Sequence, residues 1–369
     1  MEEKTSKNPM QDMLENLQLF QQTGYCERYI KQNNSQIDQD KINKYADIAS
    51  ASFRQANEFI KSAENASIAT NPLLYSYALN NFLKGLAYLK YNNDESLLNQ
   101  FGKHGFSINE IRNTLLDTNI EIKDYGAINF ITKIFNCEIA SQNIKFDCLL
   151  SQIPELSRTY FKTTGNISNT AQKKYNSDDE YIIMSENYNK LRNGDEISKY
   201  IGLSGNYISN SSFENYYLLG FTLYGKNKIQ TEKLEKNLFY KDFLILPNKF
   251  EDGLKCMNLM FYCYLTIMGY GMLVRYNAHK WEKFIDYKIS SESTLIEQSI
   301  KICVEDFLSI LHNELFGFIY KDVEYTDKRV KKIIDESTIN IMNNITRTIE
   351  RRNLIYGNND YLPWRGNLR

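Results

Sequence analysis

Apolar residues recur at helical spacing through most of this 369-residue chain. Side chains three and four positions apart share one face of an α-helix, so this pattern predicts amphipathic helices. The segments that follow it are residues 10–22, 36–62, 107–117, 126–137, 145–152, 260–285, 293–313 and 328–356.

Residues 71–89, NPLLYSYALNNFLKGLAYL, read as a helix that is apolar on nearly every side. Asn71 can serve as its N-cap, and Pro72 suits the first helical position because a missing N–H costs nothing there. One stripe of the helix is apolar throughout and predicts the face that packs into the core. Its residues are Tyr75, Leu79, Phe82, Leu86 and Leu89.

Polar residues in the middle of this helix need partners. Asn81, beside Gly85, predicts a close helix contact in which its amide bonds across the gap, because an unpartnered buried amide costs about 1–3 kcal/mol. Lys84 has two interpretations. Its stem can pack on Tyr77 and Tyr88 while the amine reaches water, or the amine can line a polar pocket that holds an anion or a carboxylate.

A second group of candidates lies in residues 272–281, MLVRYNAHKW. Arg275 at the end of an apolar run can cap helix carbonyls, pair with a buried acid, or hold a phosphate through its planar fork. His279 and Trp281 follow within two turns. His104, in GKHGFS, lies on a glycine-flanked loop, where an imidazole can approach a ligand or can be an ordinary loop residue.

The pattern changes from about residue 165 to 250, where β-rich runs alternate with Asn, Gly and Ser clusters. The runs SDDEYIIMSENYN, ENYYLLGFTLYG and KDFLILP predict a small antiparallel sheet. The fold class is therefore mainly α, a multi-helix bundle with a small antiparallel β insertion. We expect helical parts at 1–164 and 251–369 to pack into one compact unit around the insertion at 165–250. Aromatic residues of the second run either pack on the helices or leave an edge for a partner.

The run from Met257 to Val274, MNLMFYCYLTIMGYGMLV, approaches the length of a membrane span. It contains Asn258, Thr266, three tyrosines and two glycines, and no second such run accompanies it. We therefore predict a buried central helix and no membrane.

Composition and net charge limit the class of protein but do not identify its function. A content of 42% hydrophobic and 24% charged residues is that of a soluble globular protein, and the net charge of −1 gives the whole molecule no strong attraction to polyanions. The six cysteines are scattered without CxxC spacing, and the start MEEKTSKNPM lacks the apolar core of a signal peptide. These features indicate reduced thiols in a cytoplasmic protein.

Sequence motifs of common enzyme classes are absent. The chain has no P-loop, GxGxxG, GxSxG or HExxH motif, and its three histidines exclude a histidine-rich metal site. We expect no metal and no cofactor.

Five blocks, in order, resemble the bacterial YaaC-like proteins, a family without an established function. The blocks are residues 51–89, KHGFS, LLSQIPEL, MGYGMLVRYNAHKWEKF and LHNELFGFIY. The resemblance draws attention to residues that the helix pattern mostly selects as well. They are Pro72, Tyr77, Lys84, His104, Gly105, Arg275, Tyr276, Trp281, Asn313, Phe316 and Gly317. The family pattern has a proline before the tryptophan where this chain has Ala278, which implies a looser turn after Arg275.

The helix pattern is also distantly similar to HEPN bundles, many of which are ribonucleases with an Arg, four to six intervening residues and a His. Here only three residues separate Arg275 from His279, and no histidine follows Arg352. A nuclease of that type needs an acid or base near the scissile phosphate, so the spacing argues against the standard enzyme.

Two functions remain open. The first is a helical binding or regulatory protein in which Lys84, His104 and Arg275 converge on a polar pocket for a small anionic ligand or a protein partner, with a homodimer as a further option. The second is a HEPN-related RNA-binding or ribonuclease component of a toxin or antiphage defence system. A basic stripe that includes Arg347, Arg351 and Arg352 could follow RNA phosphates, or it could be a solvated helix face.

Overall fold

The computed structural model describes residues 2–34, 36–103, 105–135, 143–166, 168, 170–177, 180–185, 207–210, 220–223, 235–236, 242–245 and 258–322. Helices dominate these residues. They are α1 Pro9–Gln18, α2 Thr23–Asn33, α3 Gln39–Glu64, α4 Asn71–Lys90, α5 Glu95–Leu98, α6 Ala127–Ile134, α7 Phe146–Ser151, α8 Ser157–Thr164, α10 Leu259–Tyr276, α11 Ala278–Ile285 and α12 Ser293–Phe316, with 3₁₀ turns η1 Leu19–Gln21, η2 Asn99–Gly102 and η3 Pro154–Leu156.

The strands form four small sheets. They are β1 Glu2–Ser6, β2 Phe106–Glu110, β3 Asn119–Ile122, β4 Asn143–Lys145, β5 Thr170–Ser177, β6 Glu180–Ser185, β7 Tyr207–Asn210, β8 Gly220–Leu223, β9 Glu235–Lys236, β10 Asp242–Ile245 and β11 Phe318–Asp322. Their orders are β2-β3-β4, β6-β5-β10-β9, β7-β8 and β1-β11, and only the last pair is parallel. A mainly α fold with a small antiparallel β insertion is confirmed.

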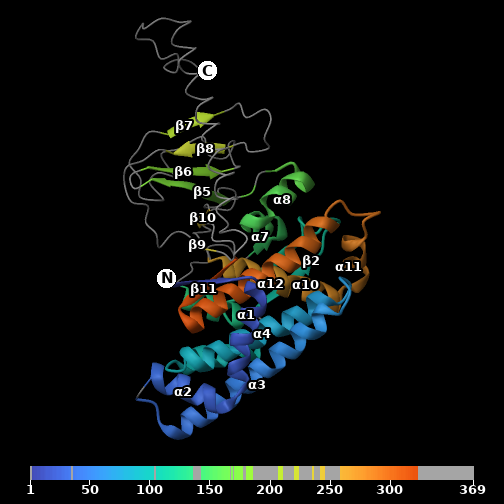
Figure 1. Cartoon of the computed structure of the whole chain (residues 1–369). Helices are drawn as coiled ribbons and strands as arrows, with labels where there is room; N and C mark the ends of the chain where they lie inside the picture. The colour runs from blue at the N-terminus through green and yellow to red at the C-terminus, as the bar shows by residue number, and fades with distance from the viewer. Residues whose placement is uncertain are drawn as a thin grey trace, which may run out of the picture.

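The core is built around α4, which packs against both α3 and α10 (Figure 1). Close approach depends on glycine at both contacts. A Cβ on Gly85 would collide with the ring of Phe53 in α3, and a Cβ on Gly271 in α10 would lie 2.6 Å from Oγ of Ser76. The predicted apolar stripe of α4 is buried except for the half-exposed Tyr75.

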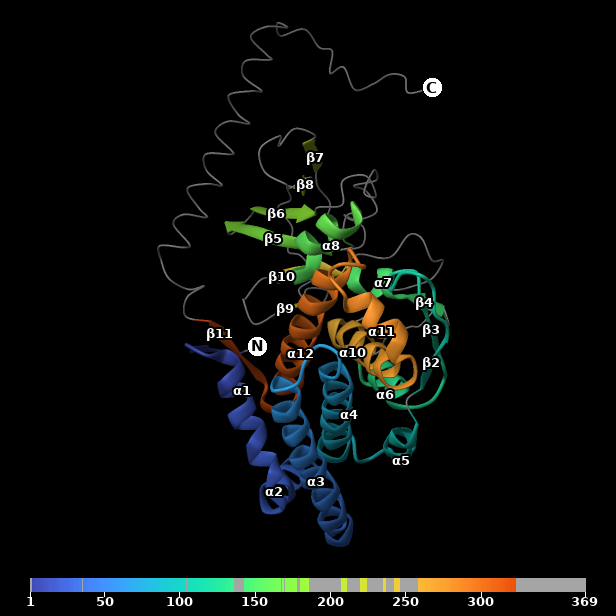
Figure 2. The same cartoon turned by 90° about the vertical axis from the view of Figure 1, so that its right-hand side faces the viewer.

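Helix α10 lies in the middle of the molecule, and every residue from Leu259 to Gly271 is buried. In Figure 2 the β2-β3-β4 sheet lies on one side of α10, and α1 with the β1–β11 pair lies on the other. The predicted buried central helix is confirmed. None of the described helices is long and apolar enough to cross a bilayer.

Two sequence expectations are corrected. The helix predicted at 107–117 is wrong, because β2 pairs with β3 there and a loop follows. Ile108 and Ile111 have helical spacing, but the pairing of β2 with a later strand overrides that local pattern. Helix α4 includes Asn71, and its N-cap is Thr70, so the predicted start moves by one residue.

The β insertion follows the predicted runs closely. Strands β6, β8 and β10 fall within the three β-rich segments, and all strand pairs of the insertion are antiparallel. The parallel β1–β11 pair, with Lys4 opposite Tyr320, joins the two ends of the described chain and was absent from the sequence expectation. The predicted helix at 328–356 lies outside the described residues.

Candidate functional site

The amides in the middle of α4 are both partnered, and the partners differ from the expectation. Asn81 donates from Nδ2 to the carbonyl of Tyr77 in its own helix, at 2.9 Å. The contact across the gap belongs to Asn80, whose Oδ1 accepts a 3.1 Å hydrogen bond from the hydroxyl of Tyr264 in α10. The prediction that Asn81 bonds across helices is therefore wrong, although α4 does carry such a bond one residue earlier.

Lys84 is half-buried on the stripe of α4 that faces α3. The ring of Tyr77 packs 5.3 Å from Phe59, and the ring of Tyr88 packs 5.5 Å from Tyr45, so aromatic pairs lie one turn before and one turn after the lysine. Within the described residues Lys84 makes no ion pair. Its position fits a stem that packs along tyrosines, and no described acid neutralises its amine.

Arg275, Tyr276 and His279 are exposed together where α10 ends and α11 begins. The guanidinium of Arg275 lies 5.0 Å from the centroid of the Tyr276 ring, and 57% of Tyr276 is exposed. Arg275 has no ion pair in the described part of the chain. A cation held over an exposed aromatic ring presents both charge and a flat apolar face to a ligand.

Trp281, two residues after His279, is buried and has a structural role. Only 1% of its surface is exposed, its Nε1–H donates to the carbonyl of Ile68 at 3.1 Å, and its ring packs 5.3 Å from that of Tyr270. Phe284 one turn later is buried as well. These contacts fix α11 against the α3–α4 connection, so the exposed residues stand on a rigid support.

The structure does not bring Lys84 and Arg275 together. Helices α4 and α10 are antiparallel, since Asn80 contacts Tyr264 while the earlier Ser76 faces the later Gly271. Lys84 lies eight residues beyond Ser76 and Arg275 four beyond Gly271, in opposite directions. At 1.5 Å per helical residue they are about 18 Å apart along the helix axes.

The other predicted site residues cannot be placed. His104 and the basic residues Arg347, Arg351 and Arg352 lie outside the described residues. The same holds for the side chains of the aromatic run in the insertion. Of the three cations that were expected to converge on one pocket, the structure describes Lys84 and Arg275, and these two are far apart.

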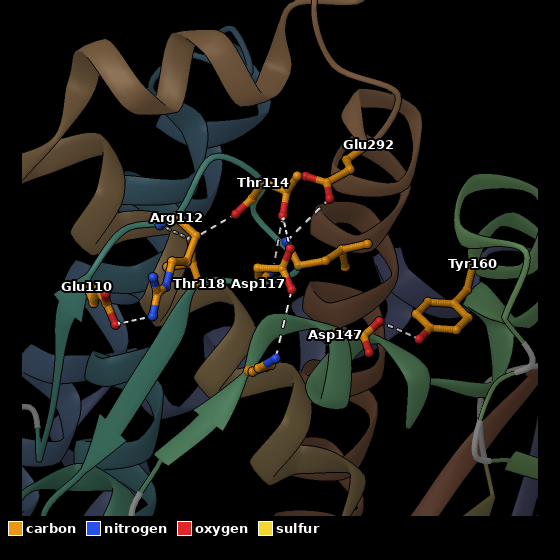
Figure 3. Close-up of polar contacts among 10 residues, drawn as sticks. Glu110, Arg112, Thr114, Asp117, Thr118, Asp147, Tyr160 and Glu292 are labelled. Atoms are coloured by element: carbon orange, nitrogen blue, oxygen red, sulfur yellow. Dashed lines mark hydrogen bonds and ion pairs between the residues drawn. The ribbon is translucent and has the colours of Figure 1, made fainter. Parts of the chain in front are cut away.

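A dense polar network surrounds the loop between β2 and β3 (Figure 3). The carboxylate of Glu292, at the start of α12, accepts backbone hydrogen bonds from Leu115 at 2.8 Å and Leu116 at 3.4 Å. Thr118 closes the loop by accepting from the backbone of Arg112 at 3.2 Å. Burial raises the pKa of Glu292, and the two backbone donors oppose that shift. The loop is an anion-binding nest already filled by the protein's own carboxylate.

Asp147 and Tyr160 form a neighbouring contact in the same view, where the phenol donates to the carboxylate (Figure 3). Burial and then the Asp147 carboxylate raise the pKa of Tyr160, so its hydroxyl stays protonated. These groups satisfy one another. The network therefore holds the β2–β3 loop, α7, α8 and α12 together.

Metal sites of the usual kind are not found in the described part of the chain, which contains no group of three or more His, Cys, Asp or Glu residues suited to a metal ion. Cys26, Cys263 and Cys303 form no disulfide among the described residues. The exposed Arg275 group is therefore the best candidate site among the residues predicted from the sequence.

Comparison with known families agrees with the blocks seen in the sequence. The chain matches the family described as YaaC-like Protein over residues 18–315, most of its length. The chain belongs to the YaaC-like family. The part of this YaaC-like chain that matches contains α4, the insertion and the α10–α11 junction, and it ends before Arg347. No curated protein and no solved structure matches the chain, so the similarity to HEPN bundles rests on the helix pattern alone.

Proposed function

We propose that this YaaC-like protein is a binding or regulatory protein whose α10–α11 junction holds an anionic small molecule or an acidic segment of a protein partner. One observation supports this most directly: Arg275 is exposed, stacked on Tyr276, and without a described acid to neutralise it. Buried Trp281 fixes the helix that follows. The binding surface consists of Arg275, Tyr276 and His279, and Lys84 is not part of it.

Charge around the junction also favours an anionic ligand. Between residues 275 and 288 the cationic residues outnumber the acidic ones by four to two, a local excess of two in a chain whose net charge is −1. These residues are Arg275, Lys280, Glu282, Lys283, Asp286 and Lys288. Exposed charges are screened over about 8 Å at physiological salt, so binding should weaken as the salt concentration rises.

A thermal-shift screen tests the proposal. The purified chain is mixed with ATP, GTP, AMP, inorganic phosphate and a glutamate-rich peptide, each with and without added salt. A ligand at 100 times its Kd stabilises the folded state by about 2.7 kcal/mol, which is readily seen as a rise in Tm. We expect at least one anionic probe to raise Tm, and this rise to shrink in Arg275→Ala.

Two variants serve as controls. Arg28 is also exposed and lies 5.7 Å from the ring of Tyr25, so Arg28→Ala removes a similar arginine from a different surface. Lys84→Ala removes the cation that the sequence placed in a shared pocket. Both should bind as the wild type does. If no anion shifts Tm, or if Arg28→Ala and Arg275→Ala lose binding equally, the proposed surface is wrong.

The alternative is a HEPN-related protein that binds or cleaves RNA as part of a toxin or antiphage defence system. The exposed Tyr276 favours it, because an aromatic face can stack on an unpaired base while Arg275 contacts a phosphate. His279 would then be the acid or base. Incubation with total RNA distinguishes the two proposals: cleavage that is lost in His279→Gln supports the nuclease, and the absence of both cleavage and salt-sensitive RNA binding rejects it.

A second copy of this chain is a further candidate partner, which would form a homodimer through the same α10–α11 junction. Sedimentation of the wild type and of Arg275→Ala separates a second copy of the chain from a different partner, because only self-association changes the mass of the purified protein alone.

A further inference from the structure

A different place in the molecule carries buried polar atoms that have no hydrogen-bond partner in the described part of the chain. Such atoms belong to Gln152, after α7, to Thr266 in α10, and to Asp306 and Ser309 in α12. All four residues are at least 95% buried. An unpartnered buried polar atom costs about 1–3 kcal/mol in proteins, so several of them in one region require an explanation such as a bound ion.

Helices α10 and α12 pack against each other where these atoms lie. The Tyr270 hydroxyl lies 2.9 Å from Oγ of Ser299, and the ring of Tyr264 stacks on that of Phe307, so α10 and α12 are antiparallel neighbours. Cys263, one residue before Tyr264, hydrogen-bonds to Cys303 of α12. Thr266 lies between Tyr264 and Tyr270 on α10, and Asp306 lies between Ser299 and Phe307 on α12, so both residues lie between the same two contacts.

Glu155 of η3 completes the group. Asp306 hydrogen-bonds to Glu155, and η3 packs against α12. Gln152 lies three residues before Glu155, and Ser309 lies one turn after Asp306 on the same face of α12. Two carboxyl groups in direct contact either share a proton or hold a cation between them.

The available ligand atoms are of one chemical kind. Carboxylates, hydroxyls and an amide carbonyl are hard oxygen ligands, which Ca²⁺ and Mg²⁺ prefer. The two nearby thiols hydrogen-bond to each other, so at least one keeps its proton, and a zinc site would need thiolates. The proposed site has only two ligands of the acidic, thiol or imidazole kind, whereas more common metal sites have three.

We propose that Glu155 and Asp306 bind a hard divalent cation at the junction of η3, α10 and α12, with oxygens of Gln152, Thr266 and Ser309 as neutral ligands. The two carboxylates supply the −2 charge that balances the ion. Because η3 and α8 lead directly into β5, the cation would fix the base of the β insertion to the central helices. This site is independent of the proposed surface at Arg275.

The test uses the full-length chain after EDTA treatment and dialysis. Tm is measured with increasing CaCl₂, MgCl₂ or MnCl₂ at pH 7.5, and EDTA is then added back. We expect a saturable rise in Tm with at least one of these cations and its reversal by EDTA; comparison of the calcium and magnesium titrations identifies the preferred ion.

Two variants with a matched control separate a specific site from general ion effects. Asp306→Asn should lose the cation-dependent shift, whereas Asp47→Asn, at an exposed position of α3, should keep it. Ser309→Ala removes one neutral ligand and should raise the apparent Kd by about tenfold while the chain still folds. This variant keeps the proposal testable if Asp306→Asn does not fold.

Three results would overturn the site. The first is the absence of any cation-dependent shift at millimolar concentrations. The second is an equal shift in the wild type and in Asp306→Asn. The third is a Kd that Ser309→Ala leaves unchanged. None of them affects the Arg275 surface, because its probes are anions and its variants lie elsewhere.

Discussion

Lowering the pH should destabilise this protein through one buried histidine. His312 in α12 is fully buried and stacks on Phe316. Asn16 Nδ2 lies 3.0 Å from Nε2 of the ring, and the carbonyl of Phe318 lies 3.2 Å from Nδ1. Because the amide nitrogen of Asn16 can only donate, Nε2 accepts and the proton is on Nδ1, where it donates to Phe318. The neutral imidazole is therefore fully satisfied.

Burial lowers the pKa of His312 from 6.5 to about 4. Below pH 6.5 the unfolded chain takes up a proton at this residue, whereas the folded chain does not until about pH 4. The free energy of unfolding should thus fall between these two pH values and then level off. A difference of roughly 2.5 pKa units corresponds to about 3 kcal/mol, a large part of the stability of a typical domain.

Urea unfolding of the wild type and of His312→Gln at several pH values from 7.5 to 4 measures this effect. Burial also raises the pKa of the Glu292 carboxyl group, but this group is present in both proteins, so the difference between the two curves isolates His312. Gln55, which does not titrate and is exposed on α3, provides the control, since Gln55→Ala should keep the wild-type pH dependence. An NMR titration in which the His312 ring ionises near pH 6.5, or a His312→Gln curve parallel to the wild type, would refute the reasoning.

Two further predictions concern packing. Gly85→Ala should lower the free energy of unfolding, because the new Cβ would lie 2.6 Å from Cδ2 of the buried Phe53 ring. Such overpacking costs about 1–3 kcal/mol, which exceeds the gain of about 1 kcal/mol from the higher helix propensity of alanine. Gly102→Ala is the control: its Cβ would enter open space, so the same urea experiment should show no loss. Trp281→Phe removes the donor to the Ile68 carbonyl and should cost about 1–3 kcal/mol, so a loss below about 0.5 kcal/mol would show that the tryptophan does not anchor α11.

Long helices with strong local signals could be predicted from the sequence. The run of α4 has a proline within its first turn and a continuous apolar stripe, and α10 is apolar on all sides, so both were identified with their burial. The strands of the insertion were also found, because β6, β8 and β10 carry short apolar runs between turn residues. All of these features are determined by residues that are close together in the sequence.

The errors concern contacts between distant segments. Strand β2 was assigned to a helix because its pairing with β3 and the Glu292 cap on the loop cannot be read from residues 107–117. Asn81 was chosen over Asn80 because helical spacing gives the face but not the partner, and Tyr264 is 184 residues away.

The spatial arrangement of the candidate site residues also depends on contacts between distant segments. The sequence indicated Arg275, Tyr276 and Lys84 as candidates, but it could not show that Arg275 and Lys84 lie at different levels of an antiparallel helix pair. Asp306 and Glu155 were missed, because a single acid on an apolar helix face is the only signal that the sequence offers. The burial of Asp306 and its contact with Glu155 appear only in the folded chain.

The central claim is that the α10–α11 junction binds an anionic group through Arg275. Its most direct measurement is the equilibrium Kd of the tightest anionic probe from the thermal-shift screen for the wild type, Arg275→Ala and Arg28→Ala at one salt concentration. A hydrogen bond to a charged group is worth about 1.5–3 kcal/mol, so we predict that Arg275→Ala raises Kd by at least about tenfold and that Arg28→Ala changes it less than about twofold. Equal Kd values for all three proteins would contradict the claim.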